Sequence, residues 1–88
     1  MELYVGNFRH TFTDRELNRL FAPFGAIVRA RVVTDHFTRQ SKCFGYVKMA
    51  NDIDGSRALQ AIDGQTVDTR KIVVRRARHR DDRKGAGW

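Results

Sequence analysis

The sequence predicts an α+β sandwich, in which two helices cover one face of a four-stranded antiparallel sheet. Segments with strand and helix periodicity follow one another in the order β-α-β-β-α-β. Each predicted strand also has one aliphatic face and one face that carries aromatic or cationic residues, so only one face of the sheet can be buried. At 88 residues, the chain has the length of one domain with a modest core.

The first half of the pattern is a strand followed by an amphipathic helix. Residues 2–6 form the strand. Thr13 stands three residues before Glu16, which is the spacing of a capping box at the start of a helix. Apolar residues then recur with the spacing of one helix face, at Leu17, Leu20, Phe21 and Phe24. Pro23 and Gly25 end this helix.

The middle of the chain predicts two further strands. Residues 27–33 form the second strand and residues 42–49 the third, joined by a polar connection over residues 34–41 that we expect to be mobile. The second strand separates its aliphatic side chains from its cations, with Val28, Ala30 and Val32 on one face and Arg29 and Arg31 on the other. Ile27 is out of phase with them, which indicates a bulge or a later start of the strand.

A second helix and a fourth strand complete the pattern. Asn51 can cap this helix, and the turn at residues 63–64 ends it. The apolar face of the helix consists of Ala58, Leu59 and Ile62. Residues 71–77 form the fourth strand, with Ile72 and Val74 toward the helices. The order β-α-β-β-α-β is that of the ferredoxin-like split βαβ motif.

The third strand, "KCFGYVKM", indicates which face of the sheet is uncovered. One set of alternating residues is Lys42, Phe44, Tyr46 and Lys48, and the other is Cys43, Gly45, Val47 and Met49. Two lysines beneath the helices would be unpaired buried charges, which are costly. We therefore expect the lysine set to face outward and the cysteine set to lie under the helices.

The uncovered face combines aromatic rings with cations. Stacking of an unpaired base on an aromatic ring contributes about 1–3 kcal/mol, and cations neutralise phosphates. The net charge of +7 also favours a polyanionic partner. We therefore predict a binding site for single-stranded nucleic acid. Its candidate residues are Tyr4, Arg31, Lys42, Phe44, Tyr46, Lys48, Arg75, Arg76 and Arg78. Stacking does not distinguish RNA from DNA.

Other classes of site find little support in the sequence. The single cysteine, Cys43, excludes an intrachain disulfide and a zinc site of the usual spacing, and we expect no cofactor. No arrangement of nucleophile, base and acid predicts an enzyme. No apolar run has the length of a membrane helix, and no secretory signal is present, so we expect a cytoplasmic protein without a membrane partner. We also expect a monomer. Phe37, in the connection, could cover the sheet or reach a base.

Two segments resemble the paired motifs of the RNA recognition motif family. "KCFGYVKM" is similar to the longer ribonucleoprotein motif, and "LYVGNF" to its shorter companion on the first strand. The resemblance implies that Tyr4 and Tyr46 stack on two successive bases. It further implies that Phe44 contacts the sugars between them and that Lys42 meets a phosphate. The chain also resembles the small one-domain RNA-binding proteins of bacteria.

The resemblance covers residues 2–78, and we assign residues 1–78 to the domain. Residues 79–88 are left as a basic tail that we predict to be disordered. The tail could clamp phosphates or only keep the protein soluble. Four departures from the family pattern stand out. Cys43, Arg39 and Thr69 replace residues that are often glycine, and Met49 replaces an aromatic residue. We expect Cys43 and Met49 to affect packing rather than binding, and Arg39 and Thr69 to affect the conformations of their loops and with them any sequence preference.

The sequence therefore predicts a non-catalytic binder of single-stranded RNA, with a role in post-transcriptional regulation or RNA chaperoning. Two alternatives are a protein-interaction module of the same fold and a binder of single-stranded DNA.

Overall fold

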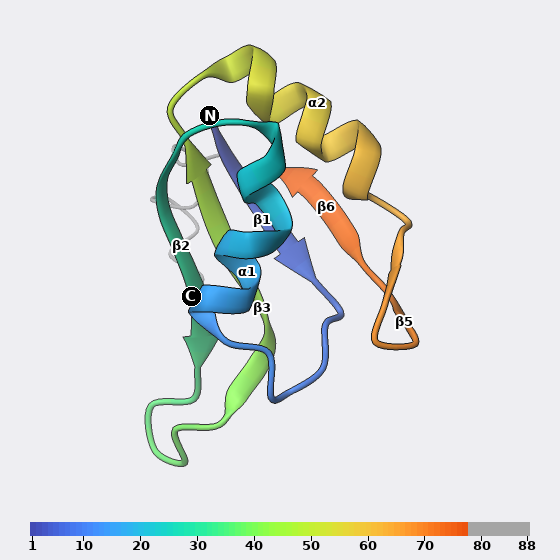
Figure 1. Cartoon of the computed structure of the whole chain (residues 1–88). Helices are drawn as coiled ribbons and strands as arrows, with labels where there is room; N and C mark the ends of the chain where they lie inside the picture. The colour runs from blue at the N-terminus through green and yellow to red at the C-terminus, as the bar shows by residue number, and fades with distance from the viewer. Residues whose placement is uncertain (78–88) are drawn as a thin grey trace.

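The structure, a computed structural model, describes residues 1–77 and has the predicted element order (Figure 1). The elements are β1 (Glu2–Gly6), α1 (Asp14–Phe21), the 3-10 helix η1 (Ala22–Phe24), β2 (Ile27–Thr34), β3 (Ser41–Met49), α2 (Asp52–Ile62), β4 (Thr66–Val67), β5 (Arg70–Lys71) and β6 (Val73–Arg76). The sequence did not predict the small β4–β5 hairpin. The predicted fourth strand, residues 71–77, is shorter than expected, because its first residue, Lys71, belongs to that hairpin and the strand begins at Val73. The predicted basic tail lies outside the described residues.

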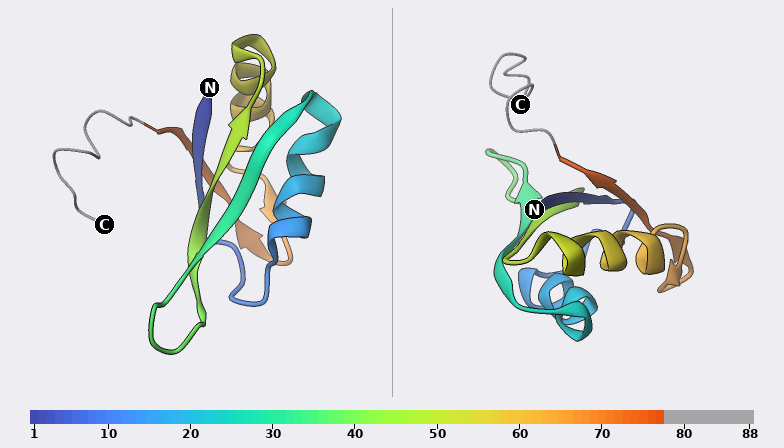
Figure 2. Two further views of the ribbon diagram at one scale, coloured as in Figure 1. Left: turned by 90° about the vertical axis from the view of Figure 1, so that its left-hand side faces the viewer. Right: turned by 90° about the horizontal axis from the view of Figure 1, so that it is seen from above.

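The main sheet has the strand order β2-β3-β1-β6, and the three neighbouring pairs are antiparallel. Both helices lie on one side of it, as the view from above in Figure 2 shows. The predicted sandwich is therefore confirmed. Because β1 lies between β3 and β6, its side chains occupy the middle of both faces of the sheet.

The core lies between the helices and the covered face of the sheet. Its fully buried members on the strands include Leu3 and Val5 from β1, Val47 and Met49 from β3, and Ile72 and Val74 at β6. The helices contribute Leu17, Phe21, Ala58 and Ile62. These are the aliphatic faces that the sequence predicted, so the assignment of covered and uncovered faces is confirmed on β1, β6 and most of β3.

Both helices begin at the predicted caps. The Thr13 hydroxyl accepts a hydrogen bond from the Glu16 backbone N–H at 3.2 Å, and the Glu16 carboxylate accepts one from the Thr13 N–H at 3.0 Å. The Asn51 side-chain oxygen accepts from the N–H of Ile53 at 2.8 Å. These bonds satisfy N–H groups that a helix start leaves without intrahelical partners, which fixes where α1 and α2 begin.

The structure corrects the predicted position of Val28. A bulge in β2 separates the pairs Ile27–Met49 and Arg29–Lys48, so that β2 has one more residue here than β3. Ile27 consequently packs against the core, and Val28, predicted to lie on the covered face, is 57% exposed.

Cys43 is a second correction. It was predicted to lie beneath the helices, but it is only half-buried, and its backbone has φ of 65°. β3 bulges here, because it holds more residues than β2 between the pairs Val32–Gly45 and Thr34–Ser41. A residue with a side chain is strained in this left-handed region, where glycine is not.

We predict that Cys43→Gly stabilises the fold by about 1 kcal/mol, because it removes the cost of holding a side chain at positive φ. The gain would appear as a higher midpoint of urea unfolding. Cys43→Ala is the matched control, since it removes the thiol and keeps the strained backbone. An equal gain in both variants would assign the effect to the thiol instead.

The connection between β2 and β3 is a closed, hydrogen-bonded turn. The Asp35 carboxylate accepts hydrogen bonds from the backbone N–H groups of Phe37, at 2.8 Å, and Thr38, at 3.0 Å. The Asp35 backbone also pairs with Arg39, at 2.9 Å, and with Gln40, at 2.7 Å. One aspartate therefore organises the whole turn, in the manner of an Asx turn.

This turn should respond to acid. The hydrogen bonds from Thr38 and Phe37, with a smaller contribution from the Lys42 charge, hold the pKa of Asp35 below its ordinary value of 3.8. A lowered carboxylate pKa means that the turn is stabilised above pH 3.8 and loses this contribution as the pH falls through the lowered value. The amide NMR signals of Phe37 and Thr38 should titrate together with a midpoint below 3.8. A midpoint at or above 3.8 would contradict the carboxylate's role.

Candidate nucleic-acid interface

The open face of the sheet carries a row of four side chains, one from each strand. Residues directly opposite one another on neighbouring strands point to the same face. Tyr4 on β1 lies opposite Tyr46 on β3 and Arg75 on β6, and Tyr46 lies opposite Arg31 on β2. Two tyrosines thus occupy the centre of the row, and an exposed arginine lies at each end. We call these four residues the central row.

Phe44 joins the two tyrosines to form a cluster of three rings. Its centroid is 5.6 Å from that of Tyr4 and 6.1 Å from that of Tyr46, and the two tyrosine centroids are 5.9 Å apart. These are the separations of aromatic pairs in contact. All three residues are half-buried rather than buried, so the rings support one another and still present surface outward.

Gly6 leaves room for one of these rings. It lies opposite Phe44, and a Cβ atom placed on it would be 2.6 Å from the Tyr4 hydroxyl oxygen and 3.0 Å from Cζ. The Tyr4 ring therefore extends along β1 over Gly6, into the space that a side chain there would fill. A larger residue at this position would displace the ring from the cluster.

A second row runs parallel to the central row. Lys48 lies between Arg29 on β2 and Glu2 on β1. The sequence predicted Lys48 as a contact but not Arg29, although Arg29 shares the strand face of Arg31. The other predicted cation of β3, Lys42, is exposed beside the Cys43 bulge, at the end of the strand near the turn.

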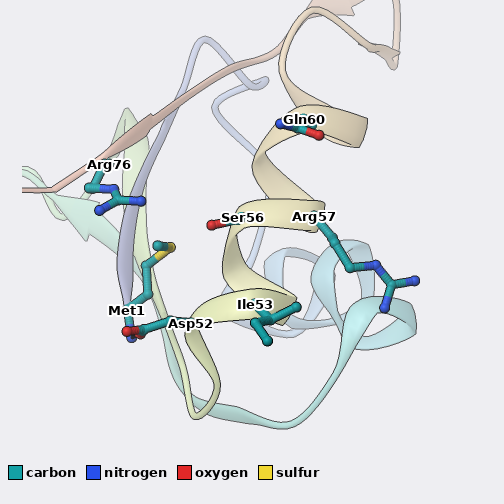
Figure 3. A pocket seen from close by; sticks show the side chains of 7 residues that line it. All are labelled: Met1, Asp52, Ile53, Ser56, Arg57, Gln60 and Arg76. Atoms are coloured by element: carbon teal, nitrogen blue, oxygen red, sulfur yellow. Dashed lines mark ion pairs between the residues drawn. The ribbon is translucent and has the colours of Figure 1, made fainter.

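Arg76 lies apart from the other predicted contacts. It is opposite Leu3, whose side chain is in the core, and it lines a groove beside α2 with Met1, Asp52, Ile53, Ser56, Arg57 and Gln60 (Figure 3). The Asp52 carboxylate in this groove pairs with the amino terminus of Met1 at 3.1 Å. Arg76 is thus on the helix side of the sheet. Arg78 lies outside the described residues.

Within residues 1–77, no group of three or more metal-ligating side chains occurs. In the same range, no helix is long and apolar enough to cross a membrane.

Comparisons with known proteins identify the family of the chain. Residues 3–73 match the model of the RNA recognition motif. The chain is 35% identical over 86 residues to RbpB of the cyanobacterium Nostoc sp., covering 98% of this chain and 84% of that protein. The predicted similarity to small bacterial members is thereby confirmed.

Two solved structures are also similar. The crystal structure of RNA binding protein PG1 has a TM-score of 0.86 and 36% identity, over 88% of this chain and 93% of that chain. The "Sxl-lethal protein/RNA complex" has a TM-score of 0.84 and 32% identity, over 88% of this chain and 46% of that chain. From its fold, its two motifs and these matches, the chain belongs to the RNA recognition motif family.

Proposed function

We propose that this protein binds single-stranded RNA on the open face of its sheet. The observation that carries the proposal is the central row, in which Tyr46 and Tyr4 lie side by side between Arg31 and Arg75. Proteins of similar fold whose names state RNA binding, at 36% and 32% identity, support it. The family consists of binding domains, so the protein is non-catalytic, as predicted.

The chemistry of the row suits an unpaired strand. A base in a duplex is already stacked on its neighbours, whereas a single-stranded base can lie on a ring of the cluster. Tyr46 and Tyr4 would each hold one base, and Phe44 would contact the sugars between them. Arg31 and Arg75 at the ends of the row would hold phosphates. Because stacking tolerates any base, this mode suits RNA chaperoning or post-transcriptional regulation.

A titration with matched oligonucleotides tests the proposal. Fluorescence anisotropy should show binding of single-stranded RNA and weaker binding of the same sequence as a duplex. A parallel single-stranded DNA measures how far the 2′-hydroxyl groups matter. Absence of affinity for every RNA at low salt would refute the proposal and favour the protein-interaction alternative.

The two terminal arginines of the row give a quantitative prediction. For single strands, each neutralised phosphate contributes about 0.7 to the slope of log K against log salt concentration. Arg31→Ala and Arg75→Ala should each reduce this slope by about 0.7. Arg57→Ala is the matched control, because Arg57 is an exposed arginine on α2, on the other side of the sheet, and should leave the slope unchanged. An unchanged slope in the row variants would remove these arginines from the interface.

A further inference from the structure

We propose that Phe37, in the turn between β2 and β3, is an additional base-stacking site that lengthens the RNA interface beyond the edge of the sheet. This inference rests on the proposed function, since the base would belong to the strand that crosses the open face. It gives a role to an exposed aromatic residue that lies outside both ribonucleoprotein-like motifs.

Phe37 is exposed to an unusual degree. Its side chain is 88% exposed, the highest value among the exposed large hydrophobic residues of the described chain, above Ile53 at 69% and Val28 at 57%. Its ring contacts that of His36 edge-on, with centroids 5.2 Å apart. The ring therefore does not cover the sheet, which was one of the two possibilities for this residue, and almost all of its surface is available to a partner.

The backbone beneath this ring is organised in advance. The Phe37 N–H is one of the two that donate to the Asp35 carboxylate, and the backbone bonds from Asp35 to Arg39 and Gln40 close the turn around it. A contact made by an organised segment loses less conformational entropy on binding than one made by a disordered loop. An exposed apolar ring on a hydrogen-bonded turn is thus suited to recognition.

The position of the turn favours RNA as the partner. In Figure 2, seen from above, the turn bends to the side of the sheet away from the helices, which is the side of the ring cluster. β3 leads from Tyr46 through Phe44 to Lys42 and then into the turn, so the ring lies on the continuation of the proposed interface. Exposed Arg39 and Lys42 follow it in the chain, and they would hold the phosphates of a strand that continues past the sheet.

Oligonucleotides of two lengths test this inference. One RNA of about four nucleotides would span the sheet, and longer RNAs would carry extensions at either the 5′ or the 3′ end. In each extension, the added nucleotides would be present either with their bases or as abasic residues. We expect one base-bearing extension to raise the affinity of the wild-type protein roughly tenfold and the abasic extension to raise it much less.

Variants assign this gain to the ring. Phe37→Ala should bind the short RNA normally and lose the gain from the longer one, whereas Phe37→Trp should keep it. Asp35→Ala should reduce the gain by releasing the turn, and Asp35→Asn, which retains a side-chain acceptor, should preserve part of it. Ile53→Ala is the matched control, because it removes an exposed apolar residue from α2 and should leave both affinities unchanged.

The outcomes separate this inference from the proposed function. If the short RNA binds and Phe37→Ala keeps the full gain, or if no base-bearing extension adds affinity, Phe37 is not a stacking site although the sheet binds RNA. If the wild-type protein forms a dimer that Phe37→Ala abolishes while the gain persists, the ring contacts a second copy and the inference is overturned. If no RNA of either length binds, the proposed function itself fails, and this inference fails with it.

Discussion

Replacing both tyrosines of the central row, in Tyr4→Ala/Tyr46→Ala, is expected to weaken RNA binding by about 2–6 kcal/mol, which would abolish measurable binding in most assays. Each ring would stack on one base, at about 1–3 kcal/mol per base. Because the two rings are in contact, at 5.9 Å, we expect the double loss to differ from the sum of the single losses. Isothermal titration of the two single variants and the double variant would measure this coupling.

The corresponding phenylalanine variants are the controls. Tyr4→Phe and Tyr46→Phe keep the ring and remove only the hydroxyl, so they should retain most of the affinity if stacking is the main contact. The melting temperature of the alanine variants should change little, because both rings are outside the core. Unchanged affinity together with a large fall in melting temperature would show that these rings stabilise the fold and do not bind RNA.

Phe21→Ala is expected to have the opposite effect, a loss of about 3–5 kcal/mol of folding stability. Phe21 is fully buried near the end of α1, where it packs between this helix and the covered face of the sheet. A helix of this length is marginal by itself, so α1 depends on the contacts of its apolar face. Since a small domain is stable by only about 5–15 kcal/mol, much of the protein could unfold at moderate temperature.

Urea unfolding measures this loss, and RNA titration at low temperature measures the affinity of the molecules that stay folded. That affinity should equal the wild-type value, because Phe21 lies on the other side of the sheet from the ring cluster. Phe21→Leu, which refills most of the volume, should recover much of the stability. Normal stability of Phe21→Ala would contradict the assigned core.

The face of each strand could be predicted because charge decides it. In the sequence, Lys42 and Lys48 alternate in phase with Phe44 and Tyr46, and burying lysine is costly enough to exclude the reverse orientation. The same reasoning placed Arg31 and Arg75 on the uncovered face. The residues of the central row could therefore be grouped before the distances between their side chains were known. The two helix caps were equally clear, since Thr13 and Asn51 satisfy groups that every helix start exposes.

Local departures from regular pairing could be predicted only in part, because the phase of Ile27 indicated a bulge or a later start of the second strand but not which side chain would turn outward. Alternation along a strand assumes that no residue is inserted, and the bulges at Val28 and Cys43 break that assumption. The sequence did contain one unused signal. Cys43, Arg39 and Thr69, noted as replacements of a usual glycine, all have φ of 64–66°. The backbone at these positions is thus of the kind that glycine adopts most easily, although glycine is absent.

The central position of β1 has a consequence for how the protein is made. Tyr4 is among the first residues to be synthesised, but its cross-strand neighbours Tyr46 and Arg75 come about forty and about seventy residues later. During translation, one edge of β1 stays unpaired until β3 has been synthesised, and the other edge stays unpaired until β6 has been synthesised. The central row is complete only when β6 pairs with β1, so we expect the proposed RNA-binding surface to be completed only after the last strand has emerged from the ribosome.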